Sequence, residues 1–256
     1  MKILAIGDLI GNAGVNELKN RLPQIREKEK IDFVIVNGEN AAEGMGITEK
    51  NFKDILSQNV NAITMGNHTW GKKDIFKFID HPKLIRPANY PKEVVGKGYG
   101  IYECNNKKIA VINLIGRVDI NVLSENPFII GKEIVEKIKN QVDIIIVDFH
   151  AEATAEKIAM GHCLDGKVTA VFGTHTHVQT ADEQILMGGT AYITDIGMTG
   201  PKNSVIGMDI QASLKRFETT LPERYKIASG ECIFNGVIFD IDDTTNKVKS
   251  IIRIRL

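Results

Sequence analysis

The chain has 256 residues, 43% of them hydrophobic and 25% charged, which is typical of a soluble globular protein with a sizeable core. Its 32 basic and 32 acidic residues give a formal net charge of zero, which argues against a general basic surface for duplex nucleic acid or an anionic membrane. No run approaches the roughly 18 apolar residues of a membrane span. The N-terminal apolar run is too short for a signal peptide and the three cysteines are scattered, so we expect a cytoplasmic protein with reduced thiols.

Strand and helix patterns alternate through the first two-thirds of the chain. Continuous apolar runs, typical of strands that are buried on both faces, are separated by segments with apolar residues at helical spacing. One helix is expected to begin after Thr48, which is a typical N-cap residue. In chain order, the predicted elements are a strand at 3–6, a helix at 15–30, a strand at 33–36, the helix after Thr48, a strand at 62–65, a short helix at 74–79, a strand at 108–114, a helix at 129–139, a strand at 143–149, a helix at 152–160 and a strand at 168–172.

The last third of the chain is predicted to consist mostly of strands, at residues 190–195, 231–241 and 247–254. A loop at 197–203 is expected to interrupt them, and residues 219–228 are expected to be exposed. Acids, Thr and Asn at 240–247 favour a hairpin turn. Because no linker is visible, the predicted fold class is α/β, with a single domain over residues 1–256 in which two mixed sheets face each other between helical layers.

Side chains that can bind metals follow five of the predicted strands, at the point where each strand ends. They are Asp8, the pair Glu39 and Asn40, the pair Asn67 and His68, His150, and the pair His175 and His177. Because ligands bind outside the carboxyl ends of the strands in open α/β sheets, these residues can meet in one small volume. Each motif alone has a plain structural explanation, such as a turn at Asp8 or a hydrogen-bonded core histidine at His150. Their coincidence at strand ends favours a two-metal hydrolytic centre.

A pair of divalent metals about 3.5–4 Å apart can clamp the attacking and leaving oxygens of a phosphoryl displacement, and it needs a bridging carboxylate. Glu39 is the best candidate for this bridge, and Asp8 has the same placement after its strand. In a turn, two histidines spaced by two residues can face different metals, although on a regular strand they would share a side. A mixed set of carboxylate, amide and imidazole ligands suits Fe, Mn or Zn better than Mg or Ca. The neutral ligands of this set would be Asn40, Asn67, His150, His175 and His177.

The same motifs resemble the calcineurin-like metallophosphoesterase superfamily, whose pattern is D-x-H, G-D, G-N-H, H, then G-H-x-H. The chain departs from this pattern at three places: Ile10 replaces the first histidine, Glu39 replaces the second Asp, and Thr174 interrupts the last motif. Asn40 is the nearest candidate to supply the ligand that Ile10 lacks. These departures resemble one branch, the YmdB-like bacterial phosphodiesterases, over essentially the whole chain. The segments that carry this closer resemblance are 7–11, 37–42 and 195–201.

The resemblance implies a four-layer α/β/β/α metallophosphoesterase sandwich and a metal-dependent phosphoric diester hydrolase. Its implied substrates are small nucleotide phosphodiesters, notably 2′,3′-cyclic nucleotides, with other cyclic nucleotides such as cAMP as further candidates. Iron or manganese is the implied metal, and zinc stays open. One metal would be held by Asp8, Glu39, Asn40 and His177, and the other by Glu39, Asn67, His150 and His175.

In the mechanism that we expect, a metal-bridging hydroxide attacks phosphorus in line. His68, which is not needed as a ligand once Asn67 is assigned, would donate a proton to the departing ribose oxygen, a contribution of about 10²–10⁴-fold. A hydrogen-bonded supporting residue is the alternative role for His68. Met45 could line the pocket, and Trp70 could stack on a base or serve as a buried anchor. The loops expected to rim the pocket are 41–46, 70–73 and 197–203.

Three other functions are weighed against this one. A dinucleotide-binding oxidoreductase is suggested by Gly7, Gly11 and Gly14, but their spacing is not the G-x-G-x-x-G that lets the backbone approach a pyrophosphate. A phosphomonoesterase could use the same metal centre. A non-enzymatic, metal-containing regulator that binds protein or RNA would not need the free acid His68 beside the metals. A homo-oligomer stays open, because the loop-rich final third could offer an apolar contact surface.

Overall fold

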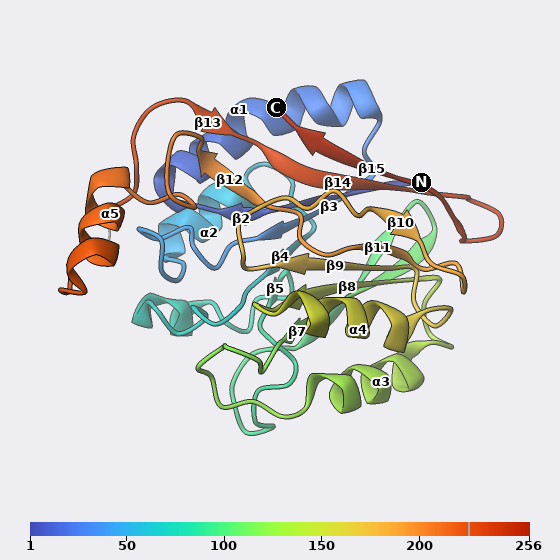
Figure 1. Cartoon of the computed structure of the whole chain (residues 1–256). Coiled ribbons are helices and arrows are strands. Elements are labelled where there is room, and N and C mark those ends of the chain that lie inside the picture. Colours follow the sequence, from blue (N-terminus) through green and yellow to red (C-terminus); the bar gives the residue numbers. More distant parts are fainter. Residues whose placement is uncertain (225) are drawn as a thin grey trace.

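The computed structural model describes residues 1–224 and 226–256, and its main feature is a pair of six-stranded mixed sheets packed face to face (Figure 1). One apolar core lies between the two sheets. A further core lies between each sheet and the helices packed against its outer face. The arrangement is therefore the α/β/β/α sandwich that the alternating pattern and the family resemblance predict. None of the described helices is both long enough and apolar enough to span a bilayer.

The first sheet joins the beginning of the chain to its end. Its strand order is β15-β14-β1-β3-β4-β5, in which β1 pairs parallel with β3 and antiparallel with β14. Its strands are β1 (Lys2–Ile6), β3 (Phe33–Asn37), β4 (Ala62–Thr64), β5 (Leu84–Ile85), β14 (Asn235–Ile241) and β15 (Val248–Arg255). The helices packed against it are α1 (Gly11–Glu29), α2 (Glu49–Leu56) and the 3₁₀ helix η1 (Lys73–Lys77).

The second sheet has the order β10-β11-β9-β8-β7-β6 and is parallel from β7 through β8 and β9 to β11. Its strands are β6 (Tyr99–Cys104), β7 (Lys107–Ile115), β8 (Ile144–His150), β9 (Ala170–Thr174), β10 (Gln184–Ile185) and β11 (Ala191–Ile193). Two helices cover its outer face, α3 (Pro127–Ile138) and α4 (Thr154–Leu164).

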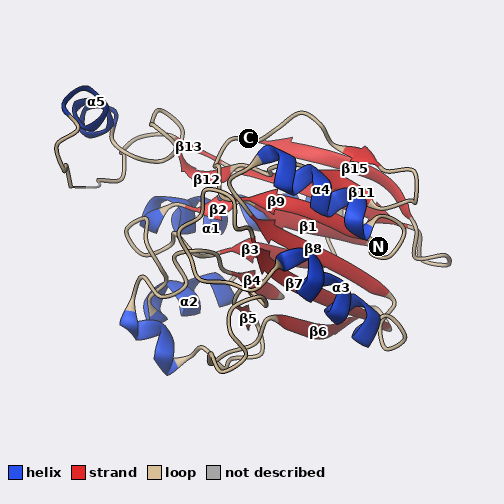
Figure 2. Cartoon of the chain, turned by 60° about the horizontal axis from the view of Figure 1, so that its bottom comes forward, coloured by secondary structure: helices blue, strands red, loops and turns tan. Residues whose placement is uncertain are grey.

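A third, three-stranded sheet corrects the prediction of a loop at 197–203. Within that segment β12 (Met198–Pro201) is fully buried, and it pairs in parallel with β2 (Asp8–Leu9) and antiparallel with β13 (Cys232–Ile233). Its glycine and proline suggested a loop, whereas pairing across distant segments makes it a strand. The structure also contains α5 (Ile210–Thr219), a helix that we did not predict. It has no buried residue and projects from the body of the molecule (Figure 2).

The local predictions hold with shifted boundaries. Thr48 caps α2 by accepting a hydrogen bond from the backbone of Asn51, and the 242–247 turn is closed by Asp242. Helix α1 begins four residues before the predicted start, and the short helix near residue 74 is 3₁₀. In the segment predicted to be exposed, residues 219–222, 224 and 226 are exposed, 223 and 227 are partly buried, Ala228 is buried, and 225 lies outside the described residues.

Strand alternation explains how polar side chains reach the space between the sheets. Successive side chains of a strand point to opposite faces. In β8, Ile144 and Ile146 belong to the core between the sheets, so Asp148 and His150 continue the same face at the carboxyl end of the strand. The inter-sheet core thus ends in polar groups where the ends of β1, β3, β4, β8 and β9 meet.

Candidate metal centre

The structure brings all the predicted site residues together at the carboxyl ends of these strands. Asp8 lies in β2 directly after β1, and His150 is the last residue of β8. The other members lie in the turns that follow their strands: Glu39, Asn40, Asn67, His68, His175 and His177. Whether they bind metal ions stays a prediction, but their assembly into one site agrees with the expected geometry.

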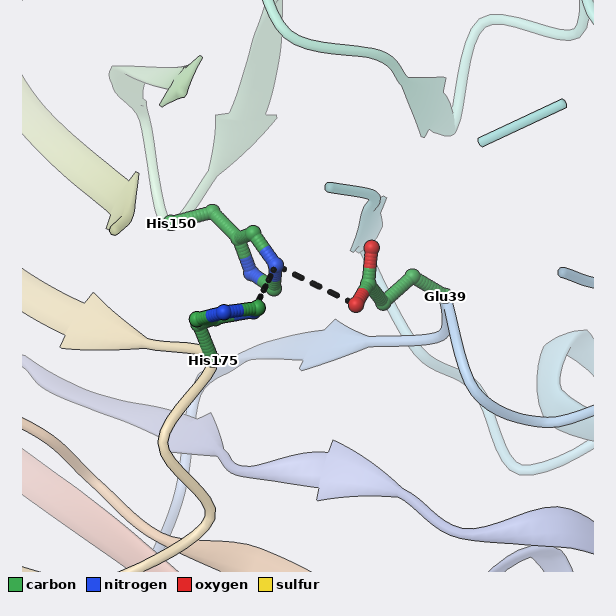
Figure 3. Close-up of side chains that lie close together, drawn as sticks. All are labelled: Glu39, His150 and His175. Carbon is green, nitrogen blue, oxygen red and sulfur yellow. Dashed lines mark hydrogen bonds and ion pairs between the residues drawn. The ribbon is translucent and has the colours of Figure 1, made fainter. Parts of the chain in front are cut away.

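The first group of ligand candidates converges on one ring nitrogen of His150. Its Nε2 lies 3.0 Å from His175 Nδ1 and 3.1 Å from Glu39 Oε1 (Figure 3). The same nitrogen lies 2.8 Å from Asn67 Oδ1. A single N–H at His150 Nε2 can donate to only one or two of these three acceptor atoms. The lone pairs of the remaining acceptors therefore face one another in a buried space. Atoms of Glu39, His150 and His175 lie within 4.8 Å of one another, which is compact enough to surround one cation.

The second group gathers around His177. Its Nε2 lies 3.1 Å from Asn40 Nδ2 and 3.2 Å from Asp8 Oδ2. Asp8 is completely buried, and within the described part of the chain neither of its carboxylate oxygens has a hydrogen-bond partner. A buried carboxylate without a hydrogen-bond donor is strongly unfavourable unless a cation neutralises it. This orphaned group is the clearest sign that the residues present fit a bound metal.

Glu39 connects the two groups, as the predicted bridge should. Its Oε1 faces His150 and also accepts from Asn40 Nδ2 at 3.3 Å, while Oε2 accepts from the backbone N–H of His68 at 3.0 Å. The approach depends on Gly66, where a Cβ would lie 2.3 Å from Glu39 Oε2 and 2.4 Å from His150 Nε2. The donor set and the space for it therefore agree with a two-metal site.

One amide differs from the expected orientation. Asn40 turns its Oδ1 toward His68 Nδ1, at 2.7 Å, and its Nδ2 toward His177. Coordination through the oxygen of Asn40 therefore requires a half-turn of the amide. That rotation would also remove the donor that now faces His177 and turn the amide oxygen toward that ring.

The charges in the metal-free site are set mainly by burial and by the mutual interactions of Glu39, His150 and Asp8. Burial disfavours the carboxylate of Glu39, but the adjacent His150 outweighs it and lowers the pKa of Glu39 to about 2. Burial also disfavours the imidazolium of His150, yet Glu39 and Asp8 raise its pKa to about 9. Burial and the charge of His150 lower the pKa of His175 to about 3. His150 therefore carries the proton, and His175 stays neutral and able to coordinate a metal.

The turn that follows β9 separates its two histidines. His175 and His177 have positive φ values of 102° and 65°, so the chain leaves strand geometry at each of them. As a result His175 faces His150, while His177 faces Asp8. The two histidines therefore face different positions of the site, as expected for a turn, and do not share one side of a strand.

Several supporting residues were missed by the sequence analysis. Glu152 Oε2 lies 3.0 Å from His175 Nε2, and Thr174 Oγ1 lies 2.9 Å from His150 Nδ1. The Thr174 hydroxyl in turn donates to Asp148 Oδ1 at 2.7 Å. Carboxylates behind metal-binding histidines fix the ring orientation and the tautomer. The sequence offered one sign of these supporting carboxylates: Asp148 lies two residues before His150, and Glu152 lies two residues after it.

A cavity of about 1000 Å³ opens in front of the centre. Two of the three predicted loops contribute to its wall, through Met45 and Lys72, whereas the described residues of 197–203 do not line it. Trp70 instead stacks on Phe76, with 5.6 Å between ring centroids, and packs against the first core, which agrees with the anchor alternative. Further apolar and cationic side chains that line the cavity are Ile206, Met208, Ile227, Arg224 and Lys226.

Comparisons with known proteins agree with this geometry. The model of the family described as YmdB-like protein matches residues 4–254. A 2′,3′-cyclic-nucleotide 2′-phosphodiesterase of Bacillus subtilis is 50% identical over 99% of this chain and 96% of its own length. The crystal structure of a novel phosphatase from Mycoplasma pneumoniae superposes with a TM-score of 0.94 at 41% identity, covering 100% of this chain and 93% of that one. The NAD nucleotidase of Haemophilus influenzae shares the fold alone, with a TM-score of 0.61 at 16% identity over 100% of this chain and 55% of that one.

Proposed function

The chain belongs to the family of YmdB-like proteins, and on this premise we propose that it is a metal-dependent phosphodiesterase that hydrolyses 2′,3′-cyclic nucleotides. The bond to be broken is the ester at the ribose O2′, which leaves a nucleoside 3′-phosphate. The observation that carries the proposal is the convergence of Glu39, Asn67 and His175 on His150, next to the cavity that Glu39 and His175 line. Such a donor set beside an open cavity suits phosphoryl chemistry better than a closed structural metal site.

The proposed centre holds two metal ions, with iron or manganese as the preferred identities. One ion would be held by Asp8, Glu39, Asn40 and His177, and the other by Glu39, Asn67, His150 and His175. Bound there, the ions would supply Lewis acidity that lowers the pKa of a coordinated water and offsets charge on the phosphoryl oxygens. The buried, unpaired carboxylate of Asp8 supports the first position, and the compact group around His150 supports the second.

The protein's own residues would position the ester and manage the proton. His68 lines the cavity, its side chain is 31% exposed, and its Nδ1 is held 2.7 Å from Asn40 Oδ1. After the half-turn that metal coordination by Asn40 requires, Nδ2 of that amide would donate to Nδ1 of His68, so the imidazole proton would lie on Nε2, the candidate donor to the departing O2′. The cations Arg224 and Lys226, which also line the cavity, would attract an anionic ester into it.

Product analysis tests this function. Purified protein loaded with Mn²⁺ is incubated with 2′,3′-cyclic AMP, and the products are separated by chromatography. The expected product is the 3′-monophosphate, formed in proportion to metal content and accumulating without further cleavage. Glu39→Gln, which removes the bridging charge, serves as the matched control and should lose both metal and activity. Release of inorganic phosphate from monoesters at a higher rate than diester cleavage would support a phosphomonoesterase instead.

A further inference from the structure

A two-residue hairpin beside the metal centre has an unusual residue at its tip. Val205 and Met208 exchange both backbone hydrogen bonds, each at 2.9 Å. The two central residues, Ile206 and Gly207, have φ values of +48° and +101°, the signs of a type I′ turn. The first central position of this turn favours Asn, Asp or Gly, and a β-branched residue there is a conformational outlier.

The backbone of Ile206 already has a clear role. Its carbonyl oxygen lies 2.9 Å from Nδ1 of His177, so that Nδ1 carries the proton and Nε2 is turned toward Asp8. Any residue at this position can provide that carbonyl, so the hydrogen bond does not explain an isoleucine. The neighbour differs in this respect, because a Cβ at Gly207 would lie 2.7 Å from Ile10 and glycine is required there.

The side chain of Ile206 faces the cavity. It is 48% exposed and forms part of the cavity wall together with Met208, Ile227 and, on the metal side, His177. An apolar side chain that is exposed, conformationally unfavourable and next to a candidate metal ligand has no evident structural benefit. Strained residues of this kind are retained where the surroundings use them for function.

We propose that Ile206 determines substrate specificity by packing its side chain against the ribose and base of the bound nucleotide while its carbonyl holds His177. The inference rests on the proposed function, since it names the part of the diester that this wall recognises. In a 2′,3′-cyclic nucleotide the base lies one ribose away from the reacting phosphorus, so a wall adjoining the metal ligands meets the nucleoside. An apolar wall recognises the faces of a heterocycle and does not read its polar edges, so the preference should extend to all four bases.

The test compares Ile206→Asn with the unchanged protein on two diesters, 2′,3′-cyclic AMP and methyl riboside 2′,3′-cyclic phosphate. The second compound keeps the reacting ring but has no base. Asparagine suits the left-handed turn and preserves the carbonyl, so the melting temperature should rise by about 2–4 °C. The ratio of kcat/KM for the nucleotide to that for the abasic diester should fall about tenfold, mainly through KM. A gain in stability with a loss of base discrimination is not expected from a purely structural residue.

Other outcomes separate the explanations. If Ile206→Asn is active and the ratio of kcat/KM is unchanged, the inference about Ile206 fails while the proposed function stands. The inference also fails if activity on both diesters falls equally and metal is lost, because the whole effect would then lie at His177. If the unchanged protein cleaves neither diester, the proposed function fails and the inference with it. Ile158→Asn, at a 40% exposed isoleucine of α4 away from the cavity, is the matched control and should keep the ratio.

Discussion

The ammonium group of Lys157 lies 2.6 Å from Oδ2 of Asp195, and both side chains are only 1% exposed. The same carboxylate oxygen accepts hydrogen bonds from the backbone N–H of Thr176 at 3.1 Å and from its hydroxyl at 2.8 Å. Thr176 is the residue between His175 and His177. A buried ion pair between α4 and the segment that follows β11 therefore holds the turn that carries two of the candidate metal ligands.

Replacement of this lysine should destabilise the fold and loosen the site. In Lys157→Met the carboxylate of Asp195 stays buried without its countercharge, and such a loss typically lowers the free energy of unfolding by about 3–5 kcal/mol. Urea denaturation of chelator-treated protein measures this change, and elemental analysis of reloaded protein should give less metal. The double variant Lys157→Met/Asp195→Leu is the control. It should recover part of the stability but not the metal content, because Thr176 and the backbone N–H of Gly197 have lost their acceptor.

A single methyl group at Gly66 should disrupt the centre. Because its Cβ would lie within 2.4 Å of both Glu39 and His150, Gly66→Ala must displace one of these side chains. Metal content and diesterase activity should fall together, by at least about tenfold each, since a ligand displaced by about 1 Å no longer fits the first coordination shell. The control is Gly189→Ala, because an added Cβ at Gly189 would have no atom within 4 Å. This substitution should be mildly destabilising, since Gly189 has a positive φ of 97°. Full metal content in Gly66→Ala would refute the close approach.

The gathering of the candidate site residues could be predicted from the sequence because each of them is tied to a strand end. A buried strand is visible as an apolar run, and the edge at which parallel strands end is common to all of them. Asp8, Glu39 and His150 could therefore be placed together without knowing the order of the strands. The same reasoning gave the helices that cover each sheet, because their apolar spacing is local.

The missed features depend on contacts that have no local signature. Lys157 follows Glu156 in α4, a charged pair whose composition suggests solvent, and only the packing of α4 on the second sheet buries the lysine against Asp195. Strand β12 has a loop-like composition and becomes a strand through pairing with β2. The left-handed conformation of Ile206 contradicts its own propensity, so no pattern rule could have identified it.

Metal binding should release a proton near neutral pH. The carboxylates of Glu39 and Asp8 outweigh burial and raise the pKa of His150 to about 9, above the ordinary value of about 6.5. The ring is therefore protonated in the metal-free protein at pH 7.5 and must be neutral to coordinate. Metal affinity should rise with pH up to about 9. Conversely, the stability that this charge gives the metal-free fold is fully present below about pH 6.5 and is lost as the pH rises through about 9.

Calorimetry in buffers of different ionisation enthalpy measures this release. Titration of Mn²⁺ at pH 7.5 should give an observed enthalpy that varies with the buffer, and the slope of this variation counts the protons released. Ionisation of a coordinated water contributes to the slope at every pH, whereas His150 contributes only where it is protonated, so the slope should be larger at pH 7.5 than at pH 10 by about one proton for each metal pair. Equal slopes at the two pH values would contradict the assignment of the proton to His150.

His68 should act on the leaving group and not on the metals. In 2′,3′-cyclic AMP the departing oxygen is a ribose alkoxide, which needs a proton, whereas p-nitrophenolate leaves without one. His68→Ala should therefore reduce kcat on the cyclic nucleotide by about 10²–10⁴-fold and on a p-nitrophenyl phosphodiester by much less. Both metals should remain, because the imidazole contacts Asn40 and Glu39 but is not needed as a ligand. A parallel loss of metal would assign His68 to coordination, and an equal loss on both substrates would exclude it as the acid. The two measurements together separate these roles, since only proton donation makes the defect depend on the basicity of the departing oxygen.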